Sequence, residues 1–211
     1  GKMAYGGSGD AHYNIEDKTS LSLVASLAFI GGLILVLVGG YFGGTVFISD
    51  MRYARALTET DSQVAAKLIV EAINLNGKDD RFYRTGSQIA LSLLSLEVNN
   101  QSQGATAERQ QRVQNYTSSA VTLAQRATQI GPRDAVNWAN LGNVYQNLLA
   151  LVDNADRLSE EAYIKAGELR PGDASYLNRI GMLYLAKYEL LRQLAPRASG
   201  ANLQRIVDQA T

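Results

Sequence analysis

The side chains that could carry out covalent chemistry are few and scattered. His12 is the only histidine and the chain has no cysteine, so it offers no thiol nucleophile and no set of converging nitrogen or sulfur ligands for a metal. The glycine-rich stretch "YGGSGD" at 5–10 lacks the preceding strand and the following lysine-bearing helix of a phosphate-binding loop. Glu160 and Glu161 are neighbours on an expected helix and point in different directions, so they do not form an acid–base pair. We predict no catalytic residue, no metal and no cofactor in this chain.

The charge balance excludes a further class of partner. Twenty Lys and Arg residues balance twenty Asp and Glu residues among 211, which gives a formal net charge of zero. A nucleic-acid-binding protein gathers a basic excess on one face, so we predict no nucleic-acid partner. The chemistry that remains is recognition by polar side chains, which depends on the elements that position them.

One long apolar stretch precedes all other expected elements. Residues 21–48, "LSLVASLAFIGGLILVLVGGYFGGTVFI", carry no charge and exceed the roughly 20 apolar residues that a membrane-spanning helix needs. A signal peptide is disfavoured, because its apolar region is about half as long and because Asp10, Glu16 and Asp17 stand here in place of a basic cluster. We predict a flexible polar lead-in over 1–20, a transmembrane helix over 21–48 and the lipid bilayer as a partner. The basic residues near the two ends of the span are nearly balanced and favour neither orientation.

Four glycines in this span form two overlapping GxxxG patterns. Small residues four apart let the backbone of another helix approach closely, and in lipid that packing replaces the missing hydrophobic driving force. Glycine is also common in membrane helices, so packing against an intramembrane helix partner, or self-association, is a hypothesis. The residues concerned are Gly39, Gly40, Gly43 and Gly44.

After the span, one arrangement of small residues occurs three times, in "AAKLIVEAINLNG" at 65–77, "AVTLAQRATQIGP" at 120–132 and "SEEAYIKAGELRP" at 159–171. Each segment has a small residue, another residue four positions on, an alanine three positions later and a helix breaker five positions after that. A small residue on each turn of one face lets a neighbouring helix lie close. The aligned sets are Ala65, Ile69, Ala72 and Gly77; Ala120, Ala124, Ala127 and Pro132; and Ser159, Tyr163, Ala166 and Pro171.

A second pattern follows the last two breakers, as in "AVNWANLGNVYQ" from 135. It resembles the first helix of the tetratricopeptide repeat, a unit of about 34 residues built from two helices. The resemblance implies that Gly142 and Gly181 are kept because the paired helix packs against them, although each costs about 1 kcal/mol relative to alanine in a helix. The expected repeat-packing residues are Trp138, Leu141, Gly142, Tyr145, Ala166, Pro171, Gly181 and Tyr184.

The expected fold is therefore all-α, with one transmembrane helix followed by an α-solenoid of about four tetratricopeptide-like hairpins over 49–211. The units are about 46–79, 80–134, 135–173 and 174–211. Good helix formers from Thr106 onward predict that the long insert of the second unit extends its second helix. The second helix of the last unit is expected at "ANLQRIVDQA", residues 201–210.

The resemblance also predicts where a partner protein binds. The first helices of such repeats line a groove that generally receives peptides or other proteins. The polar side chains at its groove-facing places partly resemble the carboxylate clamp of this family, but Ser175 stands where the clamp has lysine. We predict that other proteins bind in this groove to Arg84, Gln88, Asn140, Asn143 and Arg179.

A second resemblance covers about residues 21–195. The glycine-rich span, the "FYR" helix at 82–84, the glutamine-rich insert and the two later repeats look like the C-terminal part of bacterial polytopic proteins of the O-antigen ligase or polymerase type. That family implies a glycan transferase whose catalytic loops lie in earlier membrane segments. Three functions stay open: a membrane-anchored tetratricopeptide scaffold for protein–protein interaction at the membrane surface, which we favour, the C-terminal fragment of such a glycosyltransferase, and a structural subunit that self-assembles laterally. In none of them does this chain catalyse a reaction alone.

Overall fold

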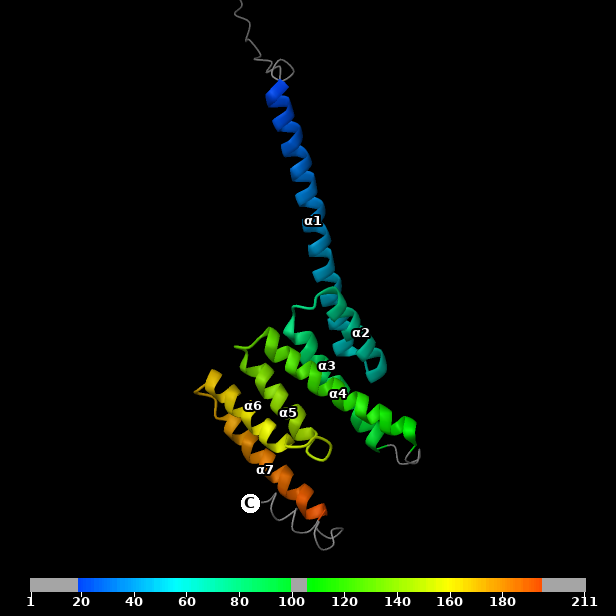
Figure 1. Ribbon diagram of the computed structural model, residues 1–211, viewed down its shortest axis with the longest axis vertical. Helices are drawn as coiled ribbons and strands as arrows, with labels where there is room; N and C mark the ends of the chain where they lie inside the picture. Colours follow the sequence, from blue (N-terminus) through cyan, green and yellow to red (C-terminus); the bar gives the residue numbers. More distant parts are fainter. Residues whose placement is uncertain (1–18, 100–105, 195–211) are drawn as a thin grey trace, which may run out of the picture. The chain divides into compact units, whose positions relative to one another are not determined.

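The computed structural model describes residues 19–99 and 106–194, and all regular structure within them is α-helical (Figure 1). The all-α prediction is therefore confirmed for these residues. Two compact units make up the chain, Gly1–Thr45 and Val46–Thr211. The helices are α1 (Thr19–Thr58), α2 (Ser62–Leu75), α3 (Asp80–Asn99), α4 (Ala107–Ile130), α5 (Ala135–Asn147), α6 (Ala155–Leu169) and α7 (Ser175–Leu194).

Helix α1 contains the apolar stretch. Its segment Leu23–Thr58 is long and apolar enough to cross a membrane, and the most apolar window is not buried inside the chain. The helix continues past residue 48, where we expected the span to end, because no glycine or proline interrupts it before Thr58. Its last turns belong to the second unit, where Ala56 is buried and Tyr53 packs with residues of α2 and α3.

The second unit is a series of helices that pack on their neighbours in the chain. The largest contacts join α3 to α4 and α5 to α6, and Figure 1 shows both pairs. Smaller contacts join α2 to α3, α4 to α5 and α6 to α7. Alternate helices also touch, α3 with α5 and α5 with α7. Side chains of α3 can therefore meet those of α5, and side chains of α5 can meet those of α7.

Local capping explains where several helices begin. The carboxylate of Asp61 accepts a hydrogen bond from the backbone N–H of Gln63 at 2.8 Å, and that of Asp134 accepts one from Val136 at 2.9 Å. The Thr106 hydroxyl accepts one from the N–H of Arg109 at 3.2 Å. Helix α4 runs without interruption from that cap to Ile130, which confirms that the insert extends this helix.

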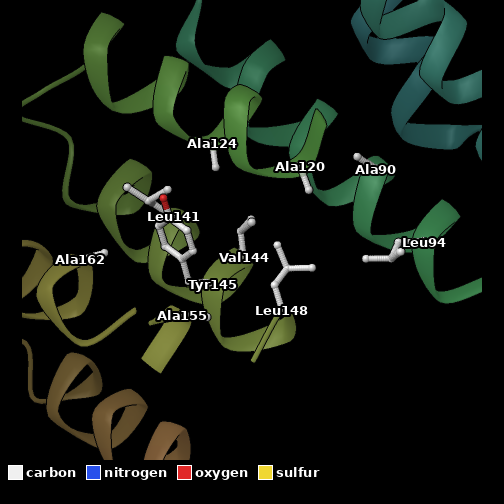
Figure 2. Close-up of a cluster of buried hydrophobic side chains, with 10 residues drawn as sticks. All are labelled: Ala90, Leu94, Ala120, Ala124, Leu141, Val144, Tyr145, Leu148, Ala155 and Ala162. Carbon is white, nitrogen blue, oxygen red and sulfur yellow. The ribbon is translucent and has the colours of Figure 1, made fainter. Parts of the chain in front are cut away.

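The small residues that repeat in the sequence lie in the interior. All nine positions before the breakers are at most 4% exposed. Four helices, α3 to α6, enclose the largest cluster, which Figure 2 shows. In it Ala120 and Ala124 of α4 leave room for Val144 and Tyr145 of α5 and for Leu148, which follows that helix, because a methyl group lets large side chains approach the helix backbone.

The two glycines that the repeat pattern singled out have different surroundings. Gly142 lies under the ring of Tyr163 on α6, and a Cβ atom there would be 2.7 Å from Cδ1 of that ring. Gly181 on α7 has no neighbouring heavy atom within 4 Å of such a Cβ. The helix expected to pack on Gly181, at 201–210, lies outside the described residues.

Of the other expected repeat-packing residues, some are buried and others are exposed. Leu141 and Tyr145 of α5 are buried, as is Ala166 of α6. Trp138 is partly buried and donates its indole N–H to the carbonyl of Pro132 at 2.8 Å. In contrast, Pro171 is exposed, and Tyr184 of α7 is 49% exposed although it aligns with Tyr145.

Candidate partner-binding face

The face formed by α3 and α5 begins at a buried amide. The side chain of Asn137 on α5 is fully buried, and its Nδ2 donates to the carbonyls of Ala127 at 3.1 Å and Gly131 at 3.2 Å. The same Nδ2 donates to Oδ2 of Asp80, and Oδ1 accepts from Arg84, both at 2.5 Å. One side chain thus joins the start of α3, the end of α4 and the first turn of α5.

Arg84, which we predicted to contact a partner, is engaged at this junction. Besides Asn137, its guanidinium reaches Oδ2 of Asp134 at 3.4 Å, and its side chain is 23% exposed. The positive charge is therefore balanced within the chain, and the side chain ties α3 to α5. A ligand carboxylate would have to compete with Asp134 for this group.

A row of uncharged amide side chains lies one turn further along α3 and α5. Gln88 of α3 donates from Nε2 to Oδ1 of Asn140 at 2.6 Å and to Oδ1 of Asn143 at 3.3 Å. Asn140 is buried and donates to the hydroxyl of Ser87 at 2.9 Å. Gln88 is exposed and Asn143 is half-buried. The structure therefore brings together three of the predicted groove residues, and the edge open to solvent can donate and accept hydrogen bonds. We call Gln88, Asn140 and Asn143 the amide row.

Arg179 lies on α7, next to α6. Its guanidinium carbon is 6.0 Å from the ring centre of Tyr163, and the residue is exposed. Within the described part of the chain it has no ion pair, unlike Arg84. Burial raises the pKa of the Tyr163 hydroxyl, which donates to Oε1 of Gln146 at 2.7 Å. Arg179 is thus the predicted groove residue whose charge is available to a partner.

Beyond the amide row the face becomes apolar. A groove of about 300 Å³ lies between the C-terminal turns of α3 and the end of α5. Its lining includes Leu91, Leu94, Ser95, Val98, Asn147 and Leu151. No sequence pattern predicts this groove, because residues 150 and 151 belong to the connection after α5, which has no periodic pattern.

Asn137 is a residue of this face that the repeat pattern did not predict. It stands three positions after the capping residue Asp134, in a helix whose apolar pattern does not require a polar residue at that place. An asparagine on the buried side of a helix is itself a signal, since a buried amide needs partners. The identity of those partners follows only from the packing of α3 and α4.

A separate ionic cluster lies where α3 begins. Arg81 donates to Asp79 at 2.6 Å and to Asp50 of α1 at 3.1 Å, and its guanidinium carbon is 5.5 Å from the ring centre of Tyr53. The hydrogen bond from Arg81 is the main cause that lowers the pKa of Asp79 below its ordinary value. The same bond raises the pKa of Arg81.

We expect this cluster to make the free energy of unfolding depend on pH in the acidic range. Because the pKa of Asp79 is lower in the folded than in the unfolded state, its contribution is present above the unfolded value of about 3.9 and is lost as pH falls through the folded value. Half of the Arg81 side chain is exposed, so the contribution should stay below about 1 kcal/mol. Urea unfolding of the full chain in detergent at pH 7 and pH 3 measures it. Arg81→Gln should reduce the difference in the free energy of unfolding between pH 7 and pH 3. Arg133→Gln, on an exposed turn, should leave this difference unchanged, and equal differences in both variants would contradict the role of Arg81.

The four glycines of the GxxxG patterns lie on α1 with open space beside them. No heavy atom outside the local helix lies within 4 Å of a Cβ built on any of them. Gly40→Leu combined with Gly44→Leu should weaken association of the full chain in detergent about tenfold, since bulky side chains prevent close backbone approach. Sedimentation analysis checks this, with Val36→Leu and Val38→Leu as the control pair. Unchanged association would remove the hypothesis of packing through these glycines.

No protein-family model matches this chain, and a search of curated proteins finds no match either.

Proposed function

We propose that this chain is a membrane-anchored scaffold of the tetratricopeptide type, which binds a partner protein on the face formed by α3, α5 and α7. The observation that carries the proposal is the set of contacts between alternate helices, α3 with α5 and α5 with α7. In a stack of helical hairpins the first helices of successive units adjoin in this way and form one continuous face. The nine buried positions before the breakers support the same arrangement, because seven of them are alanine or serine and allow close packing within each pair.

The chemistry of this face favours a particular kind of recognition. The amide row offers uncharged donors and acceptors, and the apolar groove beside it could accept a hydrophobic side chain. Arg84 is already paired with Asp134, so Arg179 is the cation left for an acidic group of the partner. An extended segment whose peptide groups bond to the amides, with an apolar side chain in the groove, fits these features.

The apolar length of α1 supports the membrane part of the proposal. A helix with an uncharged segment of this length and no burial inside the chain is stable in a bilayer, where its backbone groups bond to one another. The scaffold would then hold its partner beside the membrane surface.

Site-specific photocrosslinking in native membranes tests the proposal. A benzophenone amino acid in place of Ser95, which lines the apolar groove, should form a covalent adduct of defined mass with one partner. The matched control places the same amino acid at Gln129, an exposed position on α4. Asn143→Arg, which puts a bulky charge into the amide row, should reduce the Ser95 adduct by about tenfold, the equivalent of one lost hydrogen bond.

Three results would count against the proposal. Adducts of equal yield at Ser95 and Gln129 would show that contact is not confined to this face. An adduct at Ser95 that persists after Asn143→Arg would show that the amide row takes no part. The absence of any adduct at Ser95, in membranes where the chain is present and folded, would exclude the face as a binding site.

A further inference from the structure

One end of the second unit carries the three turns that lead into α3, α5 and α7, at 76–79, 131–134 and 170–174 (Figure 1). Each turn has one basic residue, followed by an aspartate whose carboxylate accepts a hydrogen bond from the backbone N–H two positions on. The three basic side chains are exposed, and none of them forms a salt bridge with another described residue. We call them the turn cations: Lys78, Arg133 and Arg170.

Packing among the helices places these turns next to one another. Asn137 in the first turn of α5 bonds to Asp80 at the start of α3. Ala135 shares a buried cluster with Tyr176 in the first turn of α7. Because α3 touches α5 and α5 touches α7, successive turns lie about one helix diameter apart, roughly 10 Å. A single phosphate is too small to contact all three turn cations, whereas an extended anionic surface can.

The carboxylates at this end are directed into the chain. Asp79 is 2.6 Å from Arg81, and its side chain is only 15% exposed. The other aspartates of these turns also have hydrogen-bond donors within the chain. Asp80, Asp134 and Asp173 accept from Asn137, Val136 and Ser175, in that order. The formal charges of this end are balanced, but the carboxylates are engaged inside and the turn cations face the solvent.

This end of the unit also adjoins the part of α1 that follows the apolar stretch. Asp50 comes two residues after Ile48, where that stretch ends, and it pairs with Arg81 at 3.1 Å. In a chain anchored by α1, residue 50 lies at the level of the lipid headgroups, because the uncharged residues before it fill the hydrocarbon layer. The start of α3, and the turn before it, are then held at the same level.

We propose that the turn cations bind the headgroups of anionic phospholipids, so that this end of the helical stack rests on the bilayer. This inference rests on the membrane anchor of the proposed function. An anionic bilayer favours each Lys or Arg near its surface by a factor of about five, so three of them favour the contact roughly 100-fold. The apolar groove at the other end of α3 then points away from the lipid, where a partner protein can reach it.

The fluorescence of Trp138 can measure this contact without a label on the protein. Trp138 is the only tryptophan, and its indole N–H bonds to the carbonyl of Pro132, next to Arg133. The full chain is reconstituted in vesicles that contain a lipid with a nitroxide quencher on its headgroup. Quenching should be at least about twofold stronger in an equal mixture of phosphatidylcholine and phosphatidylglycerol than in phosphatidylcholine alone. The difference should disappear in about 1 M salt, where the Debye length is about 3 Å.

A matched pair of triple variants tests the assignment to the turn cations. Lys78→Gln combined with Arg133→Gln and Arg170→Gln should abolish the difference in quenching between the two kinds of vesicles. The control removes the same charge from exposed positions elsewhere and should keep the difference. It combines Lys67→Gln, Arg157→Gln and Arg192→Gln.

Several results would overturn the proposal. Equal quenching of the natural chain in both kinds of vesicles would exclude the lipid contact, and loss of the difference in both triple variants would exclude a role for these particular cations. Loss of the difference on adding inorganic phosphate at constant ionic strength would assign the turn cations to a soluble anion. Flotation with the vesicles separates the two levels of the argument: a chain that floats but shows equal quenching keeps the anchor, whereas a chain that does not float refutes the anchor and this inference with it.

Discussion

Replacing Gly142 with valine is expected to lower the free energy of unfolding by about 3 kcal/mol, the cost of forcing extra atoms into a packed interior. A Cβ atom at this position would lie 2.7 Å from Cδ1 and 2.8 Å from Cε1 of Tyr163. The ring is fully buried, and Gln146 holds its hydroxyl, so it cannot turn aside without losing both packing and a hydrogen bond. The helix backbone of α5 would have to move away from α6 instead.

The fluorescence of Trp138 can measure this loss of stability close to the substitution. Trp138 is the only tryptophan and lies one turn before Gly142 on α5, so its fluorescence during urea unfolding of the full chain in detergent reports on this contact. Alanine allows a matched comparison. Gly142→Ala should destabilise, whereas Gly181→Ala, in open space, should stabilise by up to about 1 kcal/mol through helix propensity alone. Changes of the same sign at both positions would contradict the explanation by close packing.

Replacing Asn137 with leucine is expected to destabilise the chain by a similar amount, about 3 kcal/mol. The change removes the amide that joins the ends of α3, α4 and α5, and it leaves the carboxylate of Asp80 and the guanidinium of Arg84 without their shared partner. The carbonyls of Ala127 and Gly131 each lose one donor but still accept from the backbone N–H groups of Gly131 and Asp134. Each buried polar group left unsatisfied costs about 1–3 kcal/mol, and part of this cost is avoided where water can reach Arg84.

Asn147→Leu is the control for that experiment, measured by the same Trp138 fluorescence. Asn147 is exposed and bonds only to a carbonyl of its own helix, so its loss should change stability by less than about 0.5 kcal/mol. If Asn137→Leu proved as mild as Asn147→Leu, the hydrogen bonds around Asn137 would not contribute to the packing of α3 on α5.

The local patterns of the sequence predicted the elements of the second unit well. Small residues at fixed intervals identified the buried sides of α2, α4 and α6, and helix formers after Thr106 predicted the length of α4. Such features succeed because they depend on residues within one helix. The role of Gly142 could also be predicted, because glycine destabilises the interior of a helix unless a neighbouring element approaches it closely, as Tyr163 does here.

The polar partners on the candidate face could not be predicted in the same way. A repeat register places Arg84 and Gln88 on one side of α3, but it does not say which groups of α5 they meet. Pairing depends on the crossing of two helices about fifty residues apart in the chain. The sequence therefore suggested Arg84 as a residue for a partner, whereas the structure pairs it with Asp134.

The contacts between helices also bear on how this chain folds. All extensive packing among the described helices joins elements that are adjacent or separated by a single helix. Few long loops must close before these contacts form, so the entropic barrier is small and rapid folding is expected. The hairpin of α3 and α4, which shares the largest contact, can form while later residues are still being synthesised and then serve as the template on which α5 and α6 assemble.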